Sequence, residues 1–409
     1  MRLQLLAAAL AASISAPAFA TDIEVTHWWT SGGEAAAVKV FADSFNALGG
    51  DKWVDGAIAG GGGTARPVII SRIIGGEPMG ATQLNHGRQA EELVEAGLML
   101  DLTELATKEG WRDVIHPVSL LDSCTVDGKI YCVPINIHSW QWIWLSHKAY
   151  KDAGVEVPKN WNEFVAAAPA LEKVGIIPLA MGQQSWQTSG AFDVLLTGLG
   201  GTDLWRKVYA DKDAKAAASD EMKRVFEAFG AARKLSKGST VQDWNQATNM
   251  VITGKAGGQI MGDWAQGEFQ VANQVAGVDY TCLPGLGIQE VIGTGGDAFY
   301  FPKNDDPEIT KAQLKMASMM LTKEVQVNFN LKKGSLPVRG DVDLSAANDC
   351  MKKGLAILAS GNILPDTNQV LTPDTTGQKN DLMVEFWNNL KITPADAQAR
   401  FVKIIEDAE

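Results

Sequence analysis

The sequence predicts an α/β protein of two lobes, each built on a mostly parallel sheet flanked by helices. Short strand patterns alternate with helical patterns along the whole chain, which is typical of parallel sheets covered by helices. The chain has 409 residues, more than one hydrophobic core comfortably holds, so two lobes are expected. The sequence contains no internal repeat, coiled-coil register or low-complexity linker.

Residues 1–20 have the pattern of an export signal. Arg2 supplies a positive charge, residues 5–14 are apolar, and residues 18–20 (Ala-Phe-Ala) form a small-x-small cleavage site. The apolar stretch is too short to span a bilayer, and no cysteine for lipid attachment stands at the cleavage site. We therefore expect an exported, soluble chain that begins near Thr21. An uncleaved N-terminal helix is the alternative.

The formal net charge of −12 limits the classes of partner. It argues against nucleic acid and against anionic membrane surfaces, because both repel an acidic protein. It also disfavours a highly anionic ligand, although a local basic pocket would override that.

Four cysteines in an exported chain indicate disulfides. Cys124 and Cys132 flank Asp127-Gly128, a pair that suits a type I′ hairpin turn and brings the two sulfurs together. We predict a Cys124–Cys132 disulfide and, by elimination, a Cys282–Cys350 disulfide. Neither a Cys-x-x-Cys motif nor a Cys/His metal spacing occurs, so no metal, redox chemistry or cofactor is expected.

The stretch from Ile23 to Ala47 predicts the mouth of a ligand site. Ile23 to His27 alternate as a strand, Trp28-Trp29 end the alternation, and two glycines lead into Glu34 and an alanine-rich helix. Ligands of open α/β sheets bind at the carboxyl ends of strands. An indole face offers apolar area to a sugar ring, and a carboxylate accepts hydroxyl hydrogen bonds. The alternative is a tryptophan pair buried under the helix.

Two further stretches in the first third of the chain carry similar features. Residues 60–63 are four glycines, which either let the backbone approach a ligand or form a flexible loop; Thr64 follows and is expected to cap a helix and reach the cleft. Gln83 and Asn85 lie two apart at a predicted strand end, so their amides share one face. His86 either joins them or lies in solvent.

Tryptophans recur beside glycine and amide residues in the middle of the chain. Trp140, Trp142 and Trp144 alternate on one predicted strand face, and we expect most of them in the core. Trp186 lies in a loop among glutamines. Trp244 and Trp264 lie in polar stretches, and Trp264 follows a predicted strand as Trp28 does. These features indicate a cleft lined by aromatic and amide side chains.

In their order and spacing, these pieces resemble the sugar-binding proteins of bacterial ABC transporters (extracellular solute-binding family 1), most closely their glucose/mannose-type members. The resemblance covers essentially the whole mature chain. It rests on the following residues: Trp28-Trp29 with Glu34, Gln83-x-Asn85-His86-Gly87, Gly262-Asp263-Trp264, Gly296-Asp297, and Lys333-Gly334-Ser335-x-Pro337-Val338-Arg339.

The resemblance implies a periplasmic, monomeric receptor that captures a sugar, most simply a monosaccharide, and delivers it to an ABC permease. It implies an N-terminal lobe of residues 21–135 and 284–330 and a C-terminal lobe of residues 136–283 and 331–409, with the ligand cleft between them. It implies stacking of the sugar on Trp29 and Trp264. Hydroxyl contacts would come from Glu34, Gln83, Asn85, Asp297 and Lys333, with Trp28, Thr64, Trp186 and Trp244 around the cleft.

The chain also departs from its glucose-binding relatives. They often carry Lys or His where this chain has Asn85, and often a histidine within the range that corresponds to 373–379, where this chain has none. The resemblance therefore does not imply glucose itself.

Two alternatives to a sugar receptor remain at this point. A secreted carbohydrate-active enzyme would use two facing carboxylates, for which Glu34 and Asp297 are the candidates. The second alternative is a receptor for another polar solute, such as a polyol or a glycerophosphodiester. A phosphate group would need converging basic groups, for which Lys333 and Arg339 are the candidates.

Overall fold

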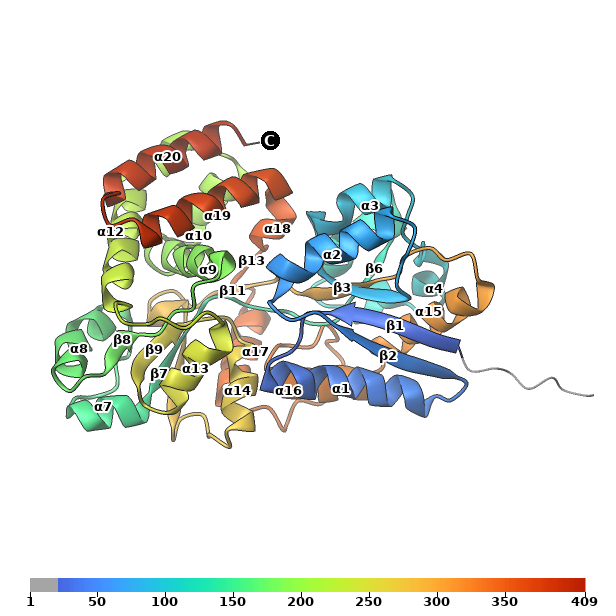
Figure 1. Cartoon of the computed structure of the whole chain (residues 1–409), viewed down its shortest axis with the longest axis horizontal. Helices are drawn as coiled ribbons and strands as arrows, with labels where there is room; N and C mark the ends of the chain where they lie inside the picture. Colours follow the sequence, from blue (N-terminus) through green and yellow to red (C-terminus); the bar gives the residue numbers. More distant parts are fainter. Residues whose placement is uncertain (1–20, 409) are drawn as a thin grey trace, which may run out of the picture.

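The computed structural model describes residues 21–408 and shows two lobes, each with its own sheet (Figure 1). The predicted export signal, residues 1–20, lies outside the described residues. We call the lobe that holds the first strand the N-lobe and the other the C-lobe. The predicted α/β class with two lobes is confirmed, whereas the predicted lobe ranges stay a prediction.

The N-lobe sheet has five strands in the order β2-β1-β3-β12-β6. Their bounds are β1 Thr21–His27, β2 Asp51–Ala57, β3 Ala81–Asn85, β6 Cys132–Pro134 and β12 Asp297–Tyr300. β1 runs parallel to β2 and β3, and β12 is antiparallel to both β3 and β6. All strands but β12 therefore run in one direction.

Helices cover both faces of this sheet (Figure 1), with α1 and α16 on one side and α2 and α3 on the other. Ser31 caps α1, because its hydroxyl accepts a hydrogen bond from the backbone N–H of Glu34. The helices are α1 Gly32–Ala47, α2 Gly62–Ile74, α3 Glu91–Glu95, α4 Thr103–Lys108, α5 Trp111–Val114, α6 Ser119–Asp122, α15 Pro307–Met320 and α16 Lys323–Lys333.

The C-lobe sheet has four strands in the order β10-β7-β9-β8. Their bounds are β7 Trp142–Ser146, β8 Ile177–Leu179, β9 Ala256–Ile260 and β10 Tyr280–Pro284. β7 is antiparallel to β9 and β10, and β8 is parallel to β9, so only β7 runs against the others.

The helices of the C-lobe include a bundle of α9, α12, α19 and α20 that packs beside the sheet. The helices are α7 His147–Ala153, α8 Trp161–Lys173, α9 Ser185–Leu195, α10 Gly201–Trp205, α11 Ala214–Ala217, α12 Asp220–Leu235, α13 Trp244–Ile252, α14 Ala265–Val271, α17 Asp349–Ser360, α18 Thr367–Val370, α19 Pro373–Asn388 and α20 Pro394–Glu406.

The reversed strands β12 and β7 have a common cause. Each begins where the chain has just crossed from the other lobe. Each strand therefore starts at the end of its sheet that faces the other lobe and runs away from that lobe. The remaining strands run toward the other lobe. Their following loops therefore collect between the lobes, which is where ligands of α/β sheets bind.

Three connecting segments join the lobes and lie side by side. The first leads from β6 to β7, the second from β10 to β12, and the third from α16 to α17. The backbone N–H of Ile137 in the first segment donates to the carbonyl of Leu336 in the third, at 2.7 Å, and the N–H of His138 donates to the carbonyl of Gly295 in the second, at 2.8 Å.

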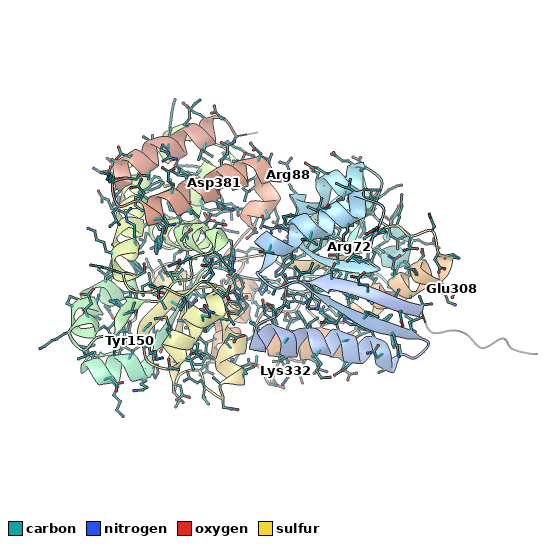
Figure 2. The ribbon with its side chains drawn as sticks, in the orientation of Figure 1. Arg72, Arg88, Tyr150, Glu308, Lys332 and Asp381 are labelled. Atoms are coloured by element: carbon teal, nitrogen blue, oxygen red, sulfur yellow. A yellow bond between two sulfur atoms is a disulfide. The ribbon has the colours of Figure 1, made fainter. Side chains whose placement is uncertain are left out.

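Side chains fill the interior of both lobes (Figure 2). Tyr150, for example, is fully buried in the C-lobe. Trp142 and Trp144 are buried and stack on each other, as predicted for most of this group. Within residues 21–408 no helix combines the length and the apolar character that crossing a membrane requires.

Both predicted disulfides are confirmed: Cys124 is bonded to Cys132, and Cys282 to Cys350. The backbone φ of Asp127 is 49° and that of Gly128 is 76°, which are the two positive values of a type I′ turn. The second disulfide joins β10 to α17, so it links the C-lobe sheet to a helix that follows the third connecting segment.

The two disulfides are expected to differ in their contribution to stability. They close loops with sequence separations of 8 and 68 residues, for which loop-closure entropy predicts about 2.5 and about 4.4 kcal/mol. We expect the double variant Cys282→Ala/Cys350→Ala to lose more unfolding free energy than Cys124→Ala/Cys132→Ala in urea titrations. Equal losses, or the opposite order, would show that loop closure does not determine the effect.

Candidate ligand-binding site

A cavity of about 400 Å³ lies between the lobes and is lined from both of them. Nine of the predicted site residues line it, and Thr64 and Gln83 do not. The nine are Trp28, Trp29, Glu34, Asn85, Trp186, Trp244, Trp264, Asp297 and Lys333.

Four indoles form an aromatic wall on the C-lobe side. Trp264 lies at its centre, with ring centroids 4.8 Å from Trp140, 6.2 Å from Trp186 and 6.5 Å from Trp244. Gly262 makes this arrangement possible, because a Cβ there would overlap the indole of Trp264. Trp264 is 8 % exposed and lines the cavity, so the wall presents apolar area to a ligand while it packs against itself.

The N-lobe side of the cavity includes a half-buried Trp28 and the four-glycine loop. Gly60 and Gly61 have φ of 103° and 74°, a conformation that favours glycine. A Cβ at Gly62 would come within 3.3 Å of the Trp28 ring. The loop therefore lies directly against Trp28 and exposes backbone to the cavity.

Trp29, on which the resemblance implies that the sugar stacks, lies mostly in the core of the N-lobe. It is 1 % exposed, and its ring contacts Phe41, Phe299 and Phe329 at centroid distances of 5.5 to 6.4 Å. All three lie in the N-lobe, so closure of the cleft does not cause this burial. Trp29 is a core residue with one edge at the cavity.

Glu34 and Lys333 form an ion pair at the cavity. The Lys333 Nζ lies 2.8 Å from the Glu34 Oε1, and their side chains are 1 % and 9 % exposed. The Lys333 Nζ also lies 5.7 Å from the centroid of the Trp29 ring. The pair fixes one donor and one acceptor at the junction of α1 and α16.

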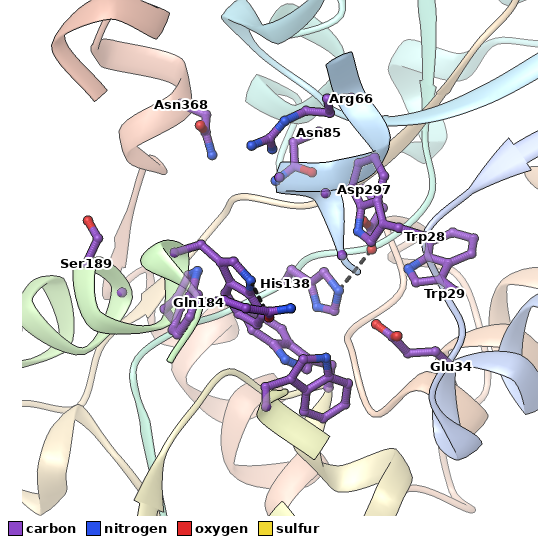
Figure 3. A pocket seen from close by; sticks show the side chains of 18 of the residues that line it. Trp28, Trp29, Glu34, Arg66, Asn85, His138, Gln184, Ser189, Asp297 and Asn368 are labelled. Atoms are coloured by element: carbon purple, nitrogen blue, oxygen red, sulfur yellow. Dashed lines mark hydrogen bonds and ion pairs between the residues drawn. The ribbon is translucent and has the colours of Figure 1, made fainter. Parts of the chain in front are cut away.

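Asp297 begins β12 and is the centre of a buried network (Figure 3). It accepts hydrogen bonds from Gln83 Nε2 at 2.7 Å and from Asn136 Nδ2 at 3.0 Å. Gln83 is fully buried, and its Oε1 accepts from the backbone N–H of Trp28 at 3.0 Å. Both ends of the Gln83 amide are therefore used inside the N-lobe, and the hydroxyl contact implied for it stays a prediction.

His138 lies at the base of the cavity between two carboxylates. Its Nδ1 is 2.7 Å from Asp263 Oδ1, and its Nε2 is 2.9 Å from Asp297 Oδ2. Burial alone would lower the pKa of His138, but the two carboxylates outweigh it and raise the pKa to about 9. Burial would likewise raise the pKa of Asp297, but His138 and Lys333 bring it well below its usual range.

The pKa of His138 predicts how stability depends on pH. A pKa raised from 6.5 to about 9 in the folded protein gives stability that is fully present below pH 6.5 and is lost as the pH rises through about 9. We expect unfolding free energy to fall over this range by up to about 3 kcal/mol more in the wild type than in His138→Gln. Urea titrations at fixed pH test this, and parallel profiles of the two proteins would contradict it.

Thr64 and His86 lie outside the cavity. Thr64 is exposed, and its hydroxyl donates to the carbonyl of Gly60 at 3.2 Å, because α2 begins two residues before it and turns its side chain outward. His86 is 1 % exposed and its Nδ1 is 2.7 Å from the Ser123 hydroxyl. Burial lowers the pKa of His86 to about 4, so its ring is neutral.

The far end of the cavity is polar, and the sequence patterns did not indicate it. Lys379 Nζ lies 2.6 Å from Asp193 Oδ2, and Asp193 also accepts from the Tyr209 hydroxyl at 2.6 Å. α9, α18 and α19 supply the other groups, which are Ser189, Asp366, Thr367, Asn368, Thr376 and Asn380. Figure 3 shows Ser189 and Asn368 on this side and Arg66 near Asn85.

The sequence of this chain is similar to known proteins over most of its length. Residues 28–327 match the bacterial extracellular solute-binding proteins. The chain belongs to this family. A "probable sugar-binding periplasmic protein" of Rhizobium meliloti is 38 % identical over 87 % of this chain and 85 % of its own. One of the same description from Mesorhizobium japonicum is 35 % identical over the full length of both.

Solved structures of low identity share the fold. A chitin oligosaccharide binding protein has a TM-score of 0.77 at 19 % identity and covers 95 % of this chain and 99 % of its own. The maltose-bound MalE3 of T. maritima has a TM-score of 0.76 at 18 % identity, with coverages of 95 % and 99 %. These likenesses confirm the two-lobe architecture of this family.

Proposed function

We propose that the protein is a periplasmic receptor that captures a sugar between its lobes and delivers it to an ABC import permease. One observation carries the proposal: an aromatic wall on the C-lobe faces charged and amide groups of the N-lobe across one cavity. Apolar ring faces and hydroxyls are the two surfaces of a sugar, and each finds a matching wall. The names of the two relatives above support the sugar and the periplasm, and membership of the extracellular solute-binding family supports the role of a receptor.

The proposed contacts follow from the position of each group. Trp264 and Trp28 stack on the ring, while Asn85 and the Glu34–Lys333 pair bind hydroxyls. Trp140, Trp186 and Trp244 complete the wall, and Asp297 offers an oxygen at the base. Arg66 adds a donor, and within residues 21–408 it forms no ion pair, so its guanidinium keeps its hydrogen-bonding capacity for a ligand.

The size of the cavity bears on the length of the sugar. A hexose at the packing density of an organic crystal occupies about 200 Å³, about half of the 400 Å³ between the lobes. The aromatic wall holds one ring, and the polar end around Lys379 and Asp193 has room for a second. The proposal therefore includes disaccharides as well as the expected monosaccharide.

The two alternative functions receive less support from the site. A glycosidase acid must stay protonated, whereas the pKa of Asp297 is lowered and Glu34 is paired with Lys333. A phosphodiester receptor needs several converging unpaired cations. Lys333, Lys379 and Arg339 are each paired with a carboxylate. Within residues 21–408, Arg66 is then a single cavity-lining cation without an ion pair, which does not make a converging set. Family membership likewise favours a receptor over an enzyme.

Calorimetric titration against a panel of monosaccharides, disaccharides, polyols and glycerophosphodiesters tests the proposal. We expect at least one sugar to bind and to raise the melting temperature by mass action. Polyols and phosphodiesters are expected to give no binding heat and no change in melting temperature. Incubation with aryl glycosides is the control for enzymatic activity. Binding of a phosphodiester alone, or turnover of a glycoside, would contradict the proposal.

A further inference from the structure

His138 is the residue at which the two lobes meet below the cavity. It lies in the first connecting segment, between the second and third segments. Asp263 belongs to the loop after β9 in the C-lobe, and Asp297 begins β12 in the N-lobe. One imidazole therefore contacts a carboxylate from each lobe, at 2.7 and 2.9 Å. The three side chains are between 4 % and 13 % exposed.

The geometry fixes the protonation state of this ring. An ionised carboxylate only accepts hydrogen bonds, so each ring nitrogen must carry a proton for both contacts to be hydrogen bonds. His138 is then an imidazolium between two carboxylates. Asp263 is held further by the backbone N–H of Ser139, which donates to its Oδ2 at 2.8 Å.

The charged groups around the ring are consistent with this state. Asp263 and Asp297 contact it directly. Burial raises the pKa of Asp263, and His138 and Lys333 oppose that shift. For Asp297, His138 and Lys333 outweigh burial and hold the pKa below its usual range. Glu34 is paired with that lysine. His86 on the N-lobe side is neutral, because burial lowers its pKa to about 4. The imidazolium is thus the cation that these two carboxylates share.

The same ring is connected to an aromatic contact in each lobe. On the N-lobe side, Asp297 accepts a hydrogen bond from the Gln83 amide, and Gln83 accepts one from the backbone N–H of Trp28. On the C-lobe side, Asp263 directly precedes Trp264, whose ring lies edge-to-face with His138 at 4.8 Å. A shift of His138 would therefore move the two facing tryptophans relative to each other.

We propose that His138 is a positioning residue: by binding one carboxylate of each lobe, it holds Trp28 and Trp264 at the separation that suits a sugar ring. The inference rests on the proposed function of the cleft. His138 acts through hydrogen bonds on the groups that touch the ligand. Such positioning within a fraction of an ångström determines much of the affinity of a preorganised site.

The test uses His138→Gln, which keeps hydrogen-bonding capacity but donates from only one atom. We expect sugar affinity at pH 7 to fall at least tenfold, about 1.4 kcal/mol. Wild-type affinity is expected to decline above pH 9, while the variant shows no such step. Asp263→Asn, which alters a residue outside the cavity lining, is expected to weaken binding in the same way.

His147→Gln is the matched control. Both ring nitrogens of His147 are also hydrogen-bonded, to the carbonyl of Val278 and the hydroxyl of Thr281, each at 2.7 Å, but away from the cavity. This variant is expected to bind sugar as the wild type does. If His138→Gln also binds as the wild type does, with the same pH profile, the inference is wrong while the receptor function stands.

NMR of the imidazole nitrogens decides the inference without a sugar, and so separates it from a failure of the proposed function. In the wild type at pH 7 we expect both nitrogens of His138 to carry protons, and the resonance to titrate at a lower pH in Asp263→Asn. A His138 ring that is neutral at pH 7 would overturn the inference, even in a protein that binds sugar.

Discussion

Replacing Trp29 with alanine is expected to lower the unfolding free energy of the sugar-free protein by about 3–5 kcal/mol. The side chain is 1 % exposed and packs on Phe41, Phe299 and Phe329. Removing the indole leaves a cavity that three other rings cannot fill without moving off their preferred packing. Denaturant unfolding in the absence of sugar measures the loss.

Trp28→Ala is the matched control, since Trp28 is the neighbouring indole and is only half-buried. We expect it to unfold much closer to the wild type and to lose affinity instead. If Trp29→Ala is as stable as Trp28→Ala, Trp29 does not belong to the N-lobe core, and the stacking role that the resemblance implies for it is favoured.

Replacing Trp264 with alanine is expected to weaken sugar binding by at least tenfold, about 1.4 kcal/mol. Trp264 is the centre of the aromatic wall, so its loss removes the surface that a sugar ring would cover and loosens Trp140 and Trp186 beside it. Because one face of Trp264 borders the cavity, Trp264→Ala should lose less unfolding free energy than Trp29→Ala. Calorimetry and denaturant unfolding of the same preparation measure the two effects.

Trp387→Ala controls for the loss of a tryptophan elsewhere in the C-lobe. Trp387 lies on α19, is partly buried, and contacts Phe229 at 5.1 Å rather than the cavity. We expect it to change stability and leave affinity intact. If Trp264→Ala is strongly destabilised yet binds sugar like the wild type, Trp264 is a core residue and not a ligand contact.

The fold was predictable where local chemistry determines it. Asp127-Gly128 specified a type I′ turn and with it the first disulfide, because both positions need positive φ. The reversal of β12 and β7 was not predictable from their residues. It depends on which lobe the chain has just left, and that is a property of the connections rather than of either strand.

The adjacent pair Trp28-Trp29 shows the limit of sequence patterns at the site. Neighbouring residues of an extended chain point to opposite sides, so Trp28 lies at the cavity while Trp29 packs into the core and reaches the cavity only with one edge. The pattern indicates the pair but not which member belongs to the core. Gln83 shows a similar limit, since a polar side chain at a strand end binds a ligand or a buried carboxylate equally well, and here it binds Asp297.

His138, Arg66 and Lys379 were missed because each lies in a stretch with another evident role. His138 stands in the connecting segment that leads into β7 and its tryptophans, Arg66 in the first turns of α2, and Lys379 in a mostly polar helix. A signal for the first was present: four of the seven residues between β6 and β7 are polar, namely Asn136, His138, Ser139 and Gln141. Their partners Asp263 and Asp297 are distant in sequence, so only the fold brings the cluster together.

Amide hydrogen exchange, compared with and without a sugar identified by calorimetry, tests most directly whether the ligand binds between the lobes. We expect sugar to slow exchange on both sides of the cavity, at residues 28–34 and 60–66 of the N-lobe and at residues 184–193 and 262–268 of the C-lobe. Slower exchange in one lobe alone, or at a surface away from these segments, would contradict a site between the lobes.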